Sequence, residues 1–138
     1  MGARRKSREL ALQMLFQRDL SGNEAASIIT TFEELRKVKP GVRDFAVKLF
    51  EGTIDEMDKI DSMIEGQADN WRLSRMAVVD RNIIRMSVWE FLHEGDTPKL
   101  VIIDEAIEIG KKFGTQKSSQ FINGILDGIL KRYNLQSG

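Results

Sequence analysis

The sequence predicts an all-α protein of about seven helices. Apolar residues recur at helical spacing almost throughout the chain, and no stretch shows the two-residue alternation of a half-buried strand. Hydrophobic residues make up 41% of the 138 residues and only two residues are proline, which is typical of a packed helical chain rather than a disordered one. This length favours a single domain, 1–138, with room for two subdomains.

Helix-breaking residues set the predicted limits in the first half of the chain. The first helix is predicted over about 7–20 and the second over about 24–37, because Ser21-Gly22-Asn23 and Pro40-Gly41 follow them. A long third helix should then run to Gly66, its predicted stop. The apolar residues of this helix share one side and are Phe45, Leu49, Phe50, Ile54, Met57, Ile60 and Ile64.

The second half begins with a predicted loop or short turn over 70–76. A strongly amphipathic helix follows over 79–93, and the next helix, 99–112, is closed by Gly114 as a C-terminal glycine cap would close it. The last helix is predicted over about 118–133, with a serine as its opening cap.

Two glycines lie one turn apart inside the predicted last helix. Gly124 and Gly128 each cost about 1 kcal/mol relative to alanine in a helix interior. Their presence therefore predicts the close approach of another element, either protein or ligand, to that side of the helix.

The start of the chain carries a compact cationic segment. Arg4-Arg5-Lys6-Ser7-Arg8 holds four positive charges in a chain whose 21 Lys and Arg balance 21 Asp and Glu, so the remainder has 17 against 21. Charge is therefore segregated, and a basic segment that leads into an apolar helix pattern favours contact with a polyanion such as RNA. The alternative is a solvated or disordered arm.

The predicted first helix has apolar residues on more than one side. At 100° per residue, one arc is wide enough for a core and comprises Leu10, Ala11, Met14 and Leu15. A second arc comprises Leu12, Phe16 and Leu20. Either the helix is buried on most sides, or it presents Phe16 to a partner.

The predicted last helix places Phe121 just outside its apolar stripe. That stripe comprises Ile122, Ile125, Leu126, Ile129, Leu130 and Tyr133. In a first helical turn beside serines and backbone N–H groups, the ring could stack on a base, which contributes about 1 to 3 kcal/mol, while the helix end receives a phosphate. The alternative is that Phe121 packs on Phe113 as a helix-entry staple.

Several classes of function find no support in the sequence. There is no P-loop, no dinucleotide fingerprint, no nucleophile elbow and no cysteine, so we expect neither an enzyme nor a cofactor. The acidic residues between Asp55 and Glu65 spread along one predicted helix with no loop to close a metal site, so a solvated face is expected there. Apolar runs are far shorter than a membrane span, so we expect no membrane contact and a cytoplasmic protein.

Three blocks of sequence stand out together. Residues 4–16 read RRKSRELALQMLF, and residues 76–90 read MAVVDRNIIRMSVWE. The third block joins IDEAIEIGKKFG at 103–114 to FINGILD at 121–127. In this order and spacing the blocks cover nearly the whole chain and resemble the NusB family of bacterial transcription antitermination factors, whose opening is also rich in arginine. The resemblance implies two packed helical subdomains, about 1–66 and about 70–134.

The resemblance also implies a function without catalysis. Members of this family bind the boxA element of nascent ribosomal RNA together with NusE, a ribosomal protein of the small subunit. Other antitermination factors and RNA polymerase would be indirect partners, and a homodimer stays open. The implied contacts with single-stranded RNA are Arg4, Arg5, Lys6, Arg8, Lys117, Ser118, Gln120 and Phe121. The implied contacts with the protein partner are Phe16 and Asp80.

The chain departs from the family pattern just before Phe121. It reads Gln116-Lys117-Ser118-Ser119 there, whereas relatives often carry acidic residues. The added positive charge should favour RNA. A helical protein–protein adaptor without sequence-specific RNA binding stays the alternative, and it predicts partner binding that is insensitive to Arg4, Arg5 and Arg8.

Overall fold

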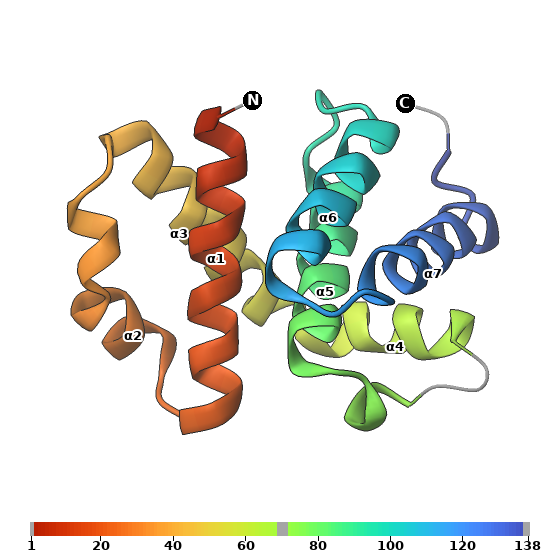
Figure 1. Ribbon diagram of the computed structural model, residues 1–138, viewed down its shortest axis with the longest axis horizontal. Coiled ribbons are helices and arrows are strands. Elements are labelled where there is room, and N and C mark those ends of the chain that lie inside the picture. The colour runs from red at the N-terminus through yellow and green to blue at the C-terminus, as the bar shows by residue number, and fades with distance from the viewer. Residues whose placement is uncertain (1, 69–71, 137–138) are drawn as a thin grey trace. The chain divides into compact units, whose positions relative to one another are not determined.

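Helices make up the regular secondary structure of the chain. This computed structural model describes residues 2–68 and 72–136, and within these ranges lie seven α-helices, two short 3₁₀ helices and no strand (Figure 1). The predicted all-α class is therefore confirmed; residues 70 and 71 of the predicted loop lie outside the described ranges. The elements are α1 (Gly2–Ser21), α2 (Ala25–Thr31), η1 (Glu33–Arg36), α3 (Pro40–Asp55), α4 (Met57–Gln67), η2 (Leu73–Arg75), α5 (Val78–His93), α6 (Lys99–Phe113) and α7 (Ser118–Arg132). Each helix in these ranges is too short or too polar to span a membrane.

The chain divides into two compact units, one ending at Asp55 and the other beginning at Glu56. In the first unit, α1 packs along α3 and also contacts α2 (Figure 1). The predicted core arc of α1 is fully buried, as expected. On the second arc Leu12 is buried, but Phe16 is 37% exposed and Leu20 is 67% exposed. Both alternatives for this arc therefore hold in part, because its first residue is buried and its last two remain accessible.

Helix α1 begins five residues earlier than predicted, so that the basic segment is helical. Ser7 was expected to open the helix, but it lies in the second turn and is buried. Its Oγ lies 2.8 Å from the Val42 carbonyl oxygen of α3 and 3.1 Å from that of Ala3, so its proton can be donated to either. This contact with α3 explains why the helix extends to Gly2, which local sequence signals did not indicate.

The predicted second helix is interrupted at Phe32. Its backbone there is extended, with φ −82° and ψ 97°, so α2 ends at Thr31 and a 3₁₀ turn, η1, follows. The Arg36 side chain folds back and donates from Nη2 to the Thr30 carbonyl oxygen at 2.9 Å, which satisfies a carbonyl at the end of α2. The prediction of one helix over 24–37 was wrong because this contact stabilises the break.

The predicted long third helix is two helices, α3 and α4. Glu56 separates them with φ −111° and ψ 21°, and its carboxylate contacts Nε2 of His93 at the end of α5. Gly66 does not stop the helix, since α4 continues to Gln67. A side chain at Gly66 would collide with the hydroxyl of Tyr133, which donates to the Met63 carbonyl oxygen at 3.3 Å. The glycine thus provides space for Tyr133 instead of a helix end.

In the second unit, α5 is the central helix and packs against α4, α6 and α7 (Figure 1). The sequence predicted an amphipathic helix, but its polar residues are buried along with its apolar ones. Arg85 donates from Nε and Nη2 to the two carboxylate oxygens of Asp61 at 2.8 and 3.0 Å, and from Nη1 to Asn82 Oδ1 at 3.1 Å. These bonds compensate the cost of burying a charge, so a polar residue here does not mark a solvated face.

Helices α6 and α7 approach each other closely. A Cβ added at Gly110 of α6 would lie 2.9 Å from Cδ1 of Ile122, whose whole side chain is buried. The predicted apolar stripe of α7 is buried except for Tyr133 at its end, which is half-buried. Close approach at Gly128 is confirmed, since a side chain there would collide with Gln67, whereas Gly124 faces open space.

Candidate functional site

The predicted contact residues fall into two groups that belong to different units. One group lies on α1 in the first unit and comprises Arg4, Arg5, Lys6, Arg8 and Phe16. The other lies in the second unit and comprises Asp80, Lys117, Ser118, Gln120 and Phe121.

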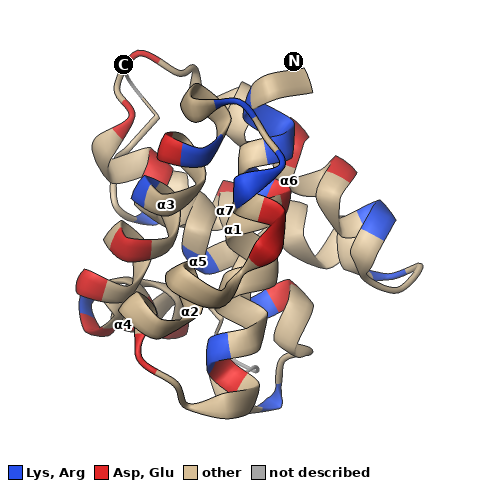
Figure 2. Cartoon of the chain, turned by 90° about the vertical axis from the view of Figure 1, so that its left-hand side faces the viewer, with Lys and Arg blue, Asp and Glu red and all other residues tan. Residues whose placement is uncertain are grey.

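The basic group forms a cationic surface on the first turns of α1. Figure 2 shows Lys and Arg gathered in the turns that follow the N-terminus. Arg4 and Lys6 are exposed and Arg5 is half-buried. Arg8 differs from them because only 4% of it is exposed. The structure therefore gives three of the four predicted cations access to a ligand.

A ring of α3 supports the first of these cations. The guanidinium carbon of Arg4 lies 3.7 Å from the centroid of the Phe45 ring, and that of Arg8 lies 6.0 Å from it. A cation–π contact at an exposed site contributes about 0.5 to 1 kcal/mol. Because the N–H donors of arginine lie in the guanidinium plane, stacking on a ring orients Arg4 without using those donors.

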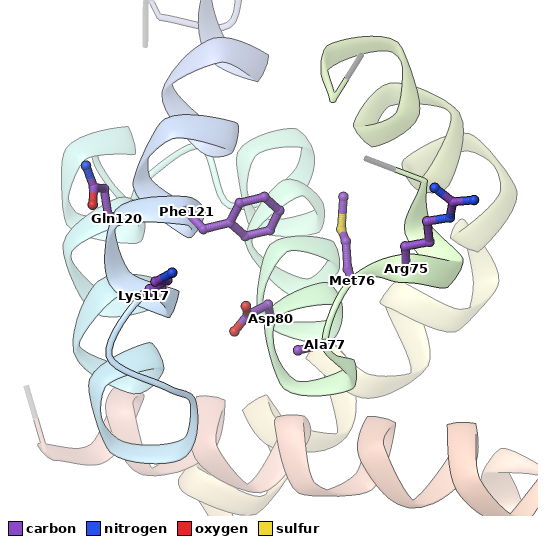
Figure 3. A pocket seen from close by; sticks show the side chains of 7 residues that line it. All are labelled: Arg75, Met76, Ala77, Asp80, Lys117, Gln120 and Phe121. Atoms are coloured by element: carbon purple, nitrogen blue, oxygen red, sulfur yellow. The ribbon is translucent and has the colours of Figure 1, made fainter. Parts of the chain in front are cut away.

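The second group lines a cavity of about 400 Å³ (Figure 3). Three segments far apart in the sequence form its walls, namely the end of η2 with the two residues after it, the first turn of α5, and the start of α7. The lining residues are Arg75, Met76, Ala77, Asp80, Lys117, Gln120 and Phe121. Four of the predicted site residues are thereby brought together: Asp80, Lys117, Gln120 and Phe121.

The loop between α6 and α7 is held by Ser118. The Oγ of Ser118 accepts a hydrogen bond from the Thr115 backbone N–H at 2.9 Å, and the residue is 1% exposed. A side chain at Gly114 would collide with this hydroxyl. Because φ at Gly114 is −100°, the residue is glycine for lack of space and not because the backbone is left-handed. Ser118 thus fixes the loop that carries Lys117, and its buried hydroxyl is not placed to reach a ligand.

The opposite wall is fixed to α5. Arg81 donates from Nη1 to the Leu73 carbonyl oxygen at 3.0 Å, and the Met76 N–H donates to the same oxygen at 3.1 Å. The cavity is also lined by three residues that were not predicted from the sequence, Arg75, Met76 and Ala77. Met76 and Ala77 begin the second block of the family pattern, and this was the only sequence feature that could have indicated a role for them. No feature of the sequence indicated a role for Arg75.

Asp80 carries an unusual buried acceptor. It is the third residue of α5 and is 8% exposed. Its Oδ1 is fully buried and has no hydrogen-bond partner among the described residues. A negative charge in the first turn is favoured by the helix dipole, but the dipole does not replace a hydrogen-bond donor.

This cavity combines the groups that recognise a planar, hydrogen-bonding ligand. In Figure 3 the Phe121 ring extends toward the Met76 side chain, and both offer apolar surface, while Lys117 and Gln120 offer donors. Single-stranded bases are bound in this way, by stacking on an aromatic ring with hydrogen bonds to their edges. Among the described residues there is no group of three or more His, Asp or Glu arranged to hold a metal ion.

Comparison with known proteins identifies the family. Residues 5–131 match the NusB family. The chain belongs to this family. It is 49% identical over 132 residues to the transcription antitermination protein NusB of Geobacter sulfurreducens, with 94% of each chain covered.

Two solved structures extend the family match to the fold. The NusB structure from T. maritima has 37% sequence identity and a TM-score of 0.84, covering 93% of this chain and 90% of that one. A chain in the crystal structure of the antitermination factors NusB and NusE in complex with dsRNA has 26% identity and a TM-score of 0.86, covering 96% of this chain and 99% of that one.

The structure places Asp80 beside residues other than the one with which the NusB family pattern grouped it. The resemblance paired Asp80 with Phe16 as contacts for a protein partner. In the structure Asp80 shares a cavity with Lys117, Gln120 and Phe121, the residues expected to contact RNA. Phe16 lies on α1, in the other unit.

Proposed function

We propose that this protein is a transcription antitermination factor that binds boxA RNA of nascent ribosomal transcripts together with NusE, within an RNA polymerase antitermination complex. The observation that carries the proposal is the cavity at the start of α7, where Phe121 and Lys117 lie together. The antitermination function of its NusB relatives and the similar chain in a NusE–dsRNA complex support it. The proposal assigns the chain no catalytic step.

Backbone contacts and base contacts come from different residues in this proposal. Arg4, Arg5 and Lys6 on α1, together with Lys117, would neutralise about four phosphates. At about 0.7 per phosphate on a single strand, a plot of log affinity against log salt should have a slope near −3. Arg8 is buried, so in this proposal its positive charge adds to that of the α1 surface without a direct contact to RNA.

NusE binding is assigned to the exposed apolar residues of α1. Phe16 and Leu20 remain accessible although the other large apolar residues of this helix are buried. Large exposed apolar side chains next to one another are typical of protein contact sites. Joining NusE and this protein on one RNA makes the second contact effectively intramolecular, so NusE should raise the RNA affinity.

The test is fluorescence anisotropy of a short boxA RNA and of a scrambled RNA of equal length, at near-physiological salt, with and without NusE. Tighter binding to boxA that strengthens with NusE is the expected result. Equal binding to both RNAs in both conditions would overturn the proposal. The exposed Phe16 would then favour the protein–protein adaptor, whose partner binding should not change in an Arg4→Ala/Arg5→Ala variant.

A further inference from the structure

We propose that Phe45 of α3 is a positioning residue for RNA binding, because its ring holds the guanidinium of Arg4 in the conformation that binds a backbone phosphate. This inference rests on the proposed RNA binding. The sequence indicated Phe45 only as an apolar residue of its helix. The inference therefore adds a residue of α3 to a binding surface that was assigned to α1 alone.

Contacts between α1 and α3 fix the position of the Phe45 ring beside two arginines. Ser7 Oγ lies 2.8 Å from the Val42 carbonyl oxygen, so the second turn of α1 is joined to the first turn of α3. Arg4 and Arg8 lie one turn apart on α1, and their guanidinium carbons are 3.7 and 6.0 Å from the Phe45 ring centroid. Phe45 is only 7% exposed, so core packing holds its ring in place.

The donors of Arg4 remain available to a ligand. Arg4 is exposed, and within the described parts of the chain no hydrogen bond or ion pair involves it. Its contact with Phe45 covers one face of the guanidinium, whereas the N–H donors lie in the plane of the group. Arg8 is buried and cannot take this role.

A guanidinium held in this way suits a phosphate. Its parallel N–H donors can bind two oxygens of one phosphate, which the compact ammonium of lysine cannot do. Ordering a long side chain during binding usually lowers affinity by about two- to tenfold. A ring that already orders Arg4 before RNA arrives would remove part of that cost.

The charge of the surrounding surface favours the RNA backbone over a protein carboxylate. Arg5 and Lys6 follow Arg4 directly, and Arg4 and Lys6 are both exposed. A nucleic acid brings several closely spaced phosphates to such a group of cations. An acidic segment of NusE is the competing ligand, and measurements without NusE distinguish the two.

The experiment is a double-mutant cycle between Arg4→Lys and Phe45→Leu, with the affinity of a short boxA RNA measured by fluorescence anisotropy without NusE. Arg4→Lys should weaken binding by about two- to tenfold in the wild-type background, because the ordered donors are lost. In the Phe45→Leu background the same change should have little effect. The salt slope should stay the same in all four proteins, since none of them loses a charge.

Phe50→Leu is the matched control for Phe45→Leu. Phe50 is also on α3 and is fully buried, and no cation–π contact involves it among the described residues. Both changes should lower the free energy of unfolding measured by urea denaturation, because each removes buried apolar volume. In the Phe50→Leu background, Arg4→Lys should still weaken RNA binding as much as it does in the wild type.

The outcomes distinguish this inference from the proposed function. If the wild type binds boxA RNA no better than scrambled RNA, the proposed function fails, but the coupling of Arg4 with Phe45 should persist with both RNAs, since phosphate contacts carry no sequence information. If the boxA preference is intact and Arg4→Lys has the same effect in the wild-type and Phe45→Leu backgrounds, or has none, the positioning role fails. Coupling that requires NusE would make Arg4 a protein contact and would also overturn the inference.

The wild type supplies a second test should Phe45→Leu not fold. NMR relaxation of the Arg4 Nε–H group, measured without RNA, reports whether this side chain is ordered on the ring before binding. We expect it to be clearly more ordered than the Nε–H group of the exposed Arg132. Equal mobility of the two side chains would overturn the positioning role.

Discussion

The basic surface of α1 and the cavity of the second unit differ in which property of a ligand they can recognise. The first presents charge on the outside of a helix, with Arg4 and Lys6 exposed to solvent. The second is a partly open cavity with apolar walls, and a carboxylate with one buried, unpartnered oxygen lies beside them. Charge on an open surface attracts any nucleic acid, whereas stacking and hydrogen bonding inside a cavity depend on which base occupies it. The α1 surface is therefore expected to provide most of the affinity for RNA, and the cavity is expected to discriminate between RNA sequences.

The largest effect on binding should come from the cavity. Phe121→Ala removes the ring face and should weaken boxA binding by about 1 to 3 kcal/mol, because base stacking on an aromatic side chain is lost. The salt dependence should stay nearly unchanged, since no charge is removed. Anisotropy titrations at several salt concentrations measure both quantities.

Leu100→Ala is the control for Phe121→Ala, because Leu100 is also a large apolar residue on a first helical turn, is 71% exposed and does not line the cavity. It should leave affinity unchanged. A folded Phe121→Ala protein with unaltered affinity would remove the ring from the binding site.

The basic surface should produce the next largest effect, with the opposite signature. Arg5→Ala together with Lys6→Ala should reduce the slope of log affinity against log salt by about 1.4 and weaken binding about tenfold near physiological salt. The preference for boxA over scrambled RNA should survive. The measurement is the same salt series with both RNAs.

Lys37→Ala with Lys39→Ala removes the same charge from an exposed part of the first unit, where Lys37 pairs with Glu34. That pair of changes should leave the slope close to the wild-type value. Equal slopes in all three proteins would contradict the role given to α1.

The anchoring of α1 should have a smaller effect, on stability. Ser7→Ala removes the hydroxyl that reaches Val42 and should lower the free energy of unfolding by about 1 kcal/mol, the usual contribution of one hydrogen bond. Urea denaturation measures it. Thr30→Ala, which removes an exposed hydroxyl bonded within its own helix, should cost less. If both changes had the same effect, the contact with α3 would not be what orders the basic segment.

The smallest effect should come from the open face of α7. Gly124→Ala should raise the free energy of unfolding by about 0.5 to 1 kcal/mol, because nothing lies within 4 Å of the added Cβ and alanine is the better helix former. Gly22→Ala also meets nothing, but φ there is +73°, so it should destabilise the protein. A loss of stability in Gly124→Ala, measured by thermal unfolding, would contradict the open face that the structure shows.

Periodicity and breaking residues predicted the helical class and most buried faces, because core burial repeats at the helical period. They did not predict the breaks at Phe32 and Glu56. The Arg36 side chain stabilises the first break, and His93, far along the chain, contacts Glu56 at the second. Contacts of this kind depend on the fold and leave no local signal in the sequence.

The candidate site also contains residues that could be predicted from the sequence and residues that could not. Phe121 was singled out by its place beside an apolar stripe, and Lys117 and Gln120 by the resemblance to the family. The wall that contains Arg75 and Met76 escaped notice because it comes from a different segment of the chain. The location of Asp80 was also unexpected, since sequence spacing does not reveal which residues share a cavity.

The ratio of boxA affinity to scrambled-RNA affinity, measured from low to near-physiological salt, tests the division between the two regions most directly. If α1 supplies charge and the cavity reads a base, both affinities should fall together as salt increases, and their ratio should stay constant above one. A ratio of one at every salt concentration, or a preference that disappears as charge is screened, would contradict this division.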